Sequence, residues 1–91
     1  MSKILIVDDD DLFLMLYKNV FEQDYYDVVT ASTTSLAMQY INSNHHFDII
    51  ITDIIMLDGT GLEVIVHAQR ERPYVPVIAM SSEPRNLKYA R

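Results

Sequence analysis

Four consecutive aspartates begin at Asp8, and a further aspartate, Asp53, follows another apolar run later in the chain. Residues 4–7 (ILIV) and 49–52 (IIIT) have the composition of strands that are buried on both faces of a parallel sheet. Ligands of open α/β sheets bind outside the carboxyl ends of the strands. If the two strands are neighbours, Asp8, Asp9 and Asp53 converge at one edge of the sheet.

Carboxylates that share a small pocket cannot all stay ionised without a compensating charge. A hard divalent cation supplies that charge, and ligands that are all oxygen favour Mg²⁺ or Mn²⁺ over zinc. A carboxylate beside such a cation can accept a phosphoryl group as an acyl phosphate. Ser81 follows a further apolar run at residues 76–80, and its hydroxyl could donate a hydrogen bond to a phosphoryl oxygen.

The elements that would position these residues alternate along the chain. Apolar runs predict strands, and apolar residues at helical spacing between capping residues predict helices. The strands are expected at residues 3–7, 26–30, 48–52 and 76–80, and the helices at about 11–22, 34–41 and 61–72, with a further helix possible from residue 86. This order predicts one α/β domain, a doubly wound parallel sheet with helices on both faces. The second strand is the most polar and suits a sheet edge.

The helices are expected to begin at capping side chains and to bury one apolar face each. Asp10 or Asp11 would cap the first helix, and Ser32 or Thr33 would cap the second. The spacing of apolar residues gives the expected faces. They are Leu12, Met15, Leu16 and Val20, widened by Phe13 and Phe21; Leu36, Ala37, Tyr40 and Ile41; and Leu62, Ile65, Val66 and Gln69. The remaining tyrosines are interpreted as packing residues, and the histidines as surface residues.

Composition and charge limit the class of protein. A chain of 91 residues makes at most one domain. Its net charge of −6 argues against nucleic acid or an anionic membrane as a partner of this chain, and it suits metal cations and basic surfaces. The sequence has no cysteine, no apolar run near the roughly 20 residues of a membrane span, and no signal-peptide pattern. We therefore expect a soluble domain of the cytoplasm.

The sequence resembles the receiver domain of two-component response regulators. The resemblance rests on residues 4–10 (ILIVDDD), 48–56 (DIIITDIIM) with 61–63 (GLE), and 76–82 (PVIAMSS), whose order and spacing all match. It covers nearly the whole chain. It implies a flavodoxin-like fold, like that of the chemotaxis receiver CheY, with strand order 2-1-3-4 in the part present here.

The resemblance also implies a role for each matching residue. Asp53 would be the phosphoacceptor that takes a phosphoryl group from a sensor histidine kinase or a phosphotransfer protein. Asp8, Asp9 and Asp53 would bind Mg²⁺ (or Mn²⁺), together with the backbone carbonyl of Ile55. Ser81 would be the switch hydroxyl that moves toward the phosphoryl group. The implied protein is a signalling module of a phosphorelay and not an enzyme.

One departure from the family pattern concerns the end of the chain. Receiver domains have a fifth strand that ends in a lysine and carries a switch aromatic, followed by a fifth helix, and this sequence stops before all of them. We therefore expect residues 1–91 to be a single receiver domain, truncated at its C-terminus and without an output domain. The fourth strand would then be an open sheet edge, through which the chain could form a homo-oligomer.

Two other functions remain open at this stage. A degenerate receiver would act as a phosphorylation-independent protein-interaction domain, which the missing lysine would permit. A phosphohydrolase of the haloacid-dehalogenase type would use Asp8 and Asp10 as nucleophile and acid, with Ser81 as its strand-end hydroxyl. The second alternative leaves Asp53 without a role.

Overall fold

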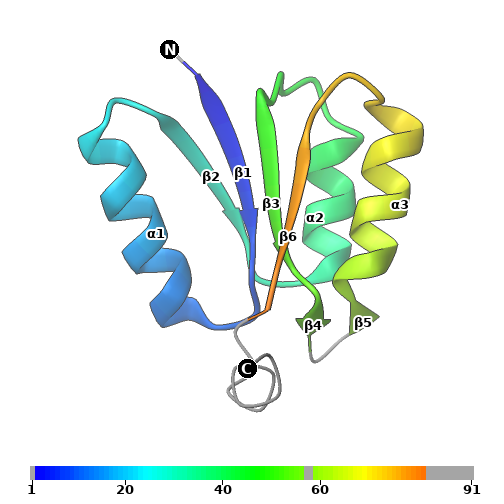
Figure 1. Ribbon diagram of the computed structural model, residues 1–91, viewed down its shortest axis with the longest axis horizontal. Coiled ribbons are helices and arrows are strands. Elements are labelled where there is room, and N and C mark those ends of the chain that lie inside the picture. Colours follow the sequence, from blue (N-terminus) through cyan, green and yellow to red (C-terminus); the bar gives the residue numbers. More distant parts are fainter. Residues whose placement is uncertain (1, 57–58, 82–91) are drawn as a thin grey trace, which may run out of the picture.

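The computed structural model describes residues 2–56 and 59–81, and the helix considered from residue 86 lies outside them. The main sheet has four parallel strands in the order β2-β1-β3-β6, which confirms the predicted fold class (Figure 1). The strands are β1 (Lys3–Val7), β2 (Asp27–Ala31), β3 (Ile49–Asp53) and β6 (Val77–Met80). Each lies within one residue of its expected position, and β2 is an edge strand as predicted.

Three helices cover the two faces of this sheet. Helix α1 (Asp11–Gln23) lies on one face, and α2 (Thr34–Ile41) and α3 (Gly61–Glu71) lie on the other (Figure 1). Successive residues of a strand point to opposite faces. In β1, Ile4 and Ile6 therefore pack on the α1 side, whereas Leu5 and Val7 pack on the side of α2 and α3. The alternation explains why residues 4–7 are all buried and all apolar.

The helix starts follow the predicted capping pattern. Asp10 caps α1, and its Oδ1 accepts hydrogen bonds from the backbone N–H of Leu12 at 2.9 Å and of Phe13 at 3.4 Å. Thr33 caps α2 and accepts from the N–H of Leu36 at 3.0 Å. In the part of the chain that the structure describes, no helix combines the length and apolarity needed to cross a membrane.

The predicted buried faces of the first and third helices are wrong. Leu12, Met15, Leu16 and Val20 are 47–58% exposed. Of the expected residues Phe21 does pack inward, together with Leu14 and Tyr17. Helix α3 buries Gly61, Val64 and Ala68 and leaves Leu62 and Val66 exposed. Both helices carry apolar residues on two faces, so periodicity alone does not identify the face that meets the sheet. The expected inward face of α2 is confirmed, because Ala37 and Ile41 are buried and Leu36 and Tyr40 pack against them.

A short two-stranded sheet connects β3 to α3, where the sequence indicated a loop. Strand β4 (Ile55–Met56) pairs antiparallel with β5 (Gly59–Thr60), so that Ile55 lies opposite Thr60. The pair folds the segment after Asp53 back toward the start of α3. It therefore holds the backbone of Ile55 close to the end of β3.

The end of α1 places a large side chain in a backbone conformation that favours glycine. The N–H of Tyr25 donates to the carbonyl of Glu22 at 3.0 Å, and the N–H of Tyr26 donates to that of Phe21 at 3.2 Å. These bonds close the helix in the manner of a Schellman motif, which needs a left-handed residue. Tyr25 fills that position with a φ of 66°, and its side chain is 82% exposed.

Replacing Tyr25 with glycine is expected to raise the free energy of unfolding by about 1 kcal/mol, because the left-handed conformation places Cβ close to the carbonyl oxygen. Urea unfolding measures the change. Tyr74→Gly is the matched control, since Tyr74 is 96% exposed and its φ is not positive. Equal destabilisation of both variants would contradict the idea that Tyr25 is strained.

Candidate functional site

Three carboxylates meet at the carboxyl end of the central strands. Asp8 and Asp9 directly follow β1, and Asp53 is the last residue of β3, the neighbour of β1 in the sheet. One oxygen from each lies within 4.8 Å of the others. Asp8 and Asp53 are buried, with 0% and 2% of their surface exposed, and Asp9 is half-buried. The structure thus brings together the three residues for which a cation site was predicted.

Asp8 is held in a setting that disfavours its own charge. Its Oδ1 accepts a hydrogen bond from the N–H of Asp10 at 3.0 Å, whereas its Oδ2 is buried and has no hydrogen-bond partner. Burial raises the pKa of Asp8, the hydrogen bond from Asp10 opposes that rise, and the negative charges of Asp53, Asp9 and Asp10 add to it. A buried carboxylate oxygen that lacks a partner, among other carboxylates, fits a hard divalent cation.

Asp53 is fixed by the strands on either side of it. It pairs with Met80 in the register of β3 and β6, and the N–H of Ile54 donates to the carbonyl of Met80 at 3.0 Å. The N–H of Ile55 faces the Asp53 side chain and donates to its Oδ1 at 3.4 Å. Ser81 is exposed and directly follows Met80, so it lies at the same end of the sheet. The ligand role of the Ile55 carbonyl and the switch role of Ser81 stay predictions.

The two remaining aspartates of the acidic run lie outside this cluster. Asp10 uses its carboxylate to cap α1, and Asp11 lies in the first turn of that helix. An acidic residue there is stabilised by the positive end of the helix dipole. The sequence therefore places two aspartates in the site and two in the start of the next helix.

Gly61 is a positioning residue, which the sequence marked only as part of the motif at residues 61–63 (GLE). It is the first residue of α3 and is buried, and its N–H donates to the carbonyl of Ile54 at 2.7 Å. A Cβ at this position would lie 1.7 Å from the carbonyl oxygen of Asp53, so the backbone would have to move. Only glycine lets α3 start against the end of β3. No periodicity or composition signal marks this contact.

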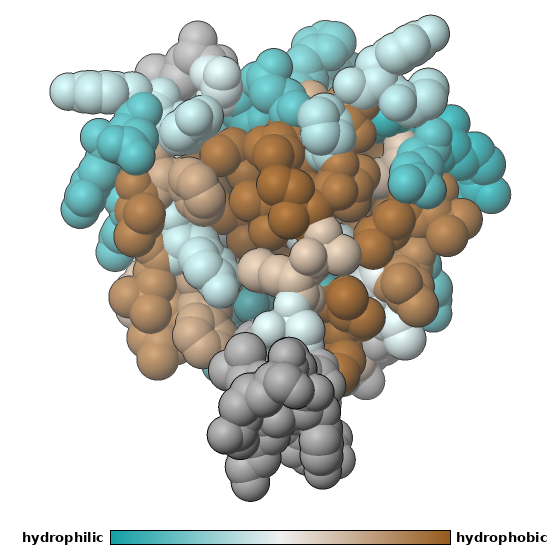
Figure 2. Space-filling view, viewed as in Figure 1, coloured by the Kyte–Doolittle hydropathy of each residue, from teal (hydrophilic) through white to brown (hydrophobic). Residues whose placement is uncertain are grey.

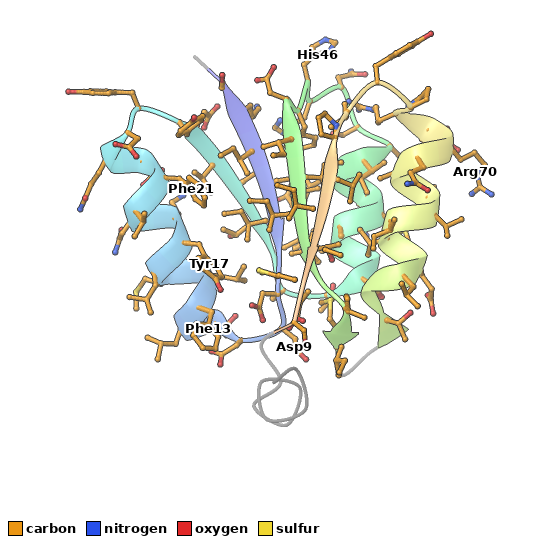
Figure 3. The ribbon with its side chains drawn as sticks, viewed as in Figure 1. Asp9, Phe13, Tyr17, Phe21, His46 and Arg70 are labelled. Atoms are coloured by element: carbon orange, nitrogen blue, oxygen red, sulfur yellow. The ribbon has the colours of Figure 1, made fainter. Side chains whose placement is uncertain are left out.

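Tyr17 also belongs to the surroundings of the site, although the sequence suggested only packing. It projects from α1 toward the sheet (Figure 3) and stacks on Phe13 with ring centroids 6.1 Å apart. Burial raises the pKa of Tyr17, and the negative charges of Asp8 and Asp53 raise it further. The phenol therefore lies within electrostatic reach of two of the clustered carboxylates.

Comparison with known proteins agrees with this arrangement. The sequence profile of the response regulator receiver domain matches residues 4–90. The nisin biosynthesis regulatory protein NisR of Lactococcus lactis is 38% identical over 81 residues, which are 89% of this chain and 34% of NisR. A two-component response regulator of Oryza sativa subsp. indica is 34% identical over 84 residues, which are 91% of this chain and 12% of that protein. The chain thus spans about a third or less of these relatives.

Solved structures show the same fold. A response regulator receiver domain protein from Clostridium thermocellum superimposes with a TM-score of 0.84 at 27% identity, over 99% of this chain and 74% of that one. A chain from the complex of the histidine kinase ThkA with the response regulator protein TrrA superimposes with a TM-score of 0.82 at 27% identity, over 90% of this chain and 70% of that one. The chain belongs to the response regulator receiver domain family.

Asp8→Asn is expected to raise the free energy of unfolding by about 1–3 kcal/mol at pH 7 without divalent cations, because it removes a buried charge whose Oδ2 has no hydrogen-bond partner. Because the pKa of Asp8 is higher in the folded protein than in the unfolded chain, protonation of its carboxyl group favours the folded state. The stabilisation that the protonated Asp8 carboxyl gives is fully present below its ordinary pKa of 3.8. It is lost as the pH rises through the higher pKa that Asp8 has in the folded protein. The advantage of the variant should therefore vanish near pH 3.8.

Urea unfolding across this pH range, with and without Mg²⁺, measures the effect. Mg²⁺ should stabilise the parent by preferential binding to the folded state, and it should leave Asp8→Asn nearly unchanged. Asp24→Asn, at the exposed C-terminal end of α1, is the matched control and should respond to Mg²⁺ as the parent does. Loss of stability at pH 7 in Asp8→Asn alone would contradict the electrostatic account.

Proposed function

We propose that this chain is a phosphoacceptor signalling module of a two-component phosphorelay, with Asp53 as the residue that is phosphorylated. The observation that carries the proposal is the clustering of Asp53 with Asp8 and Asp9 within 4.8 Å, beside a buried Asp8 oxygen that has no partner. Such a cluster suits a cation and a phosphoryl group better than it suits three bare charges.

The transfer step is a displacement at phosphorus. A carboxylate oxygen of Asp53 attacks the phosphorus of a phosphohistidine on the donor, the new P–O bond forms an acyl phosphate, and the P–N bond breaks with its electron pair left on the imidazole. The pairing of β3 with β1 and β6 fixes the backbone of Asp53 at the carboxyl end of the sheet. The N–H of Ile55 orients its carboxylate through the bond to Oδ1.

Asp8, Asp9 and Asp53 would hold Mg²⁺ or Mn²⁺, and the carbonyl of Ile55 would complete the protein ligands. When bound, the cation neutralises negative charge on the carboxylates and on the phosphoryl oxygens. The oxygen-only donor set of this chain fits such hard cations. Ser81, one residue past the partner of Asp53 in the register, would donate its hydroxyl to a phosphoryl oxygen.

The alternatives receive less support from the geometry. A phosphohydrolase of the haloacid-dehalogenase type needs Asp10 as its acid, but the carboxylate of Asp10 already caps α1 and is not part of the cluster. A phosphorylation-independent interaction domain would not require an unpartnered buried carboxylate oxygen. We therefore infer a signalling role rather than an enzymatic one, and a cytoplasmic location.

Incubation of the parent chain with acetyl phosphate and Mg²⁺ is expected to add one phosphoryl group, which intact mass spectrometry detects. The adduct should require Mg²⁺ and should be absent from Asp53→Asn, because the amide is a far weaker nucleophile than the carboxylate. Asp48→Asn, an exposed acid just before β3, is the matched control and should be phosphorylated normally. A folded parent that forms no adduct would overturn the proposal in favour of the interaction domain.

The outward face of α1 suggests where a phosphodonor protein binds. This face, here called the α1 patch, consists of Leu12, Met15, Leu16 and Val20. Hydrophobic surface runs along α1 at the left of the molecule (Figure 2). The helix begins at Asp11, beside the acidic cluster, so a partner on the patch would be close to Asp53. A sensor histidine kinase or a phosphotransfer protein with an apolar, basic-rimmed surface fits this arrangement.

Introducing glutamate at Met15 and Val20 is expected to slow phosphoryl transfer from a histidine kinase by about tenfold or more, because it places charge in an apolar contact. The donor would be the kinase that phosphorylates the parent fastest in a panel. Phosphorylation by acetyl phosphate should not change, since that donor needs no docking surface.

The matched control for the α1 patch places glutamate at Leu62 and Val66, which are 55% and 60% exposed on α3. Equal slowing by the two double variants, or slowing with acetyl phosphate, would show that the patch has no specific role. A homo-oligomer formed through the edge of β6 stays a prediction. Within residues 2–56 and 59–81, β6 pairs only with β3.

A further inference from the structure

Tyr17 lies between α1 and the strands that end in the acidic cluster. It packs against the apolar residues of β1 and α1, including Ile6 and Leu14. It also lines a cavity of about 200 Å³ together with Ile6, Phe21, Ile51 and Met80. Three of these wall residues belong to β1, β3 and β6. These are the strands that lead to Asp8, Asp53 and Ser81, so the ring stands beside the site.

The direction of the helix brings the hydroxyl of Tyr17 toward that site. Helix α1 begins at Asp11, at the carboxyl end of β1. Side chains of an α-helix point back toward its N-terminus. Tyr17 lies six residues into α1, about 9 Å along the axis at 1.5 Å per residue, and a long aromatic side chain covers much of that distance. Figure 3 shows it reaching from α1 toward the sheet, at whose lower end Asp9 lies.

The electrostatic coupling supports the same placement. The pKa of Tyr17 is raised by burial and by the charges of Asp8 and Asp53, so the phenol keeps its proton and remains a hydrogen-bond donor at neutral pH. The described charges that act on the Asp8 carboxylate, those of Asp53, Asp9 and Asp10, are all negative. A neutral donor can enter this environment without the penalty that a further carboxylate would meet.

We infer that Tyr17 binds the phosphoryl group, its hydroxyl donating a hydrogen bond to an oxygen of the acyl phosphate formed on Asp53. The inference rests on the proposed phosphorylation of Asp53. The phenol keeps its proton throughout, and no covalent bond to Tyr17 is made or broken. The adjacent cavity gives the ring of Tyr17 room to adjust its position while α1 and the strands stay in place. Tyr17 thus supplies a neutral donor from the α1 side of the site, opposite the loop that carries Ile55.

Tyr17→Phe tests this role because it removes the hydroxyl and keeps the ring that packs on Phe13. Tyr26→Phe is the matched control. Tyr26 lies just before β2, away from the acidic cluster, and its ring packs edge-on against Phe21 with ring centroids 5.9 Å apart. Both variants and the parent are incubated with acetyl phosphate and Mg²⁺, and intact mass spectrometry follows adduct formation. Loss of a hydrogen bond to a charged group should slow Tyr17→Phe by roughly tenfold or more, with Tyr26→Phe unchanged.

The ³¹P chemical shift of the adduct is the second readout. It should differ between Tyr17→Phe and the parent, and it should be the same in Tyr26→Phe and the parent. Only phosphorylated protein gives this signal, so a lower yield of adduct alone cannot reproduce a change in its chemical shift. If the parent forms no adduct, the phosphoacceptor proposal itself fails and takes this inference with it. If the parent is phosphorylated and Tyr17→Phe matches it in rate and in ³¹P shift, only the role of Tyr17 is overturned.

Discussion

Crowding of negative charge at one end of a parallel sheet is the constraint that shapes this molecule. Asp8 and Asp53 are buried, and one oxygen from each lies within 4.8 Å of an oxygen of Asp9. Because the two side chains are buried, water screens the repulsion between their charges only weakly. Their repulsion is tolerated because β1 and β3 are paired along their length and are surrounded by apolar residues on both faces. The packed sheet holds the carboxylates in a geometry they would not adopt in free solution. A bound divalent cation would relieve the repulsion, whereas a phosphoryl group adds negative charge and would itself need such a cation.

The strands and the clustered aspartates were predicted because continuous apolar runs such as residues 4–7 permit few interpretations. The order of the strands in the sheet came instead from the resemblance to receiver domains. Local chemistry narrowed each helix cap to two neighbouring residues, Asp10 or Asp11 and Ser32 or Thr33. The buried faces of α1 and α3 could not be predicted from the sequence, because both helices are apolar on two sides. The way each helix packs onto the sheet decides which side is covered. The short β4–β5 pair, the contact of Gly61 and the direction of Tyr17 depend on tertiary geometry, which no local pattern encodes.

Hydrophobic and charged surfaces are divided in a way that suits a transient encounter. The α1 patch is apolar and begins next to the acidic end of the sheet. Apolar contact supplies affinity without demanding a single orientation, whereas charge accelerates the encounter and selects against wrong partners. A partner that combines an apolar ridge with basic residues would meet both surfaces at once. Such a partner would cover α1 and the carboxyl end of the sheet, while α3 presents a separate exposed surface through Leu62 and Val66.

Gly61 brings the start of α3 into direct contact with the end of β3. Its N–H donates to the carbonyl of Ile54, and its Cα sits so close to the carbonyl of Asp53 that a methyl group has no space. The contact acts as a rigid joint between the end of β3 and the first turn of α3. A displacement of the backbone at Asp53 must therefore carry the start of α3 with it, and Leu62, the next residue, would change its position on the surface. A change at the buried carboxylate of Asp53 would in this way alter the surface that a partner protein contacts.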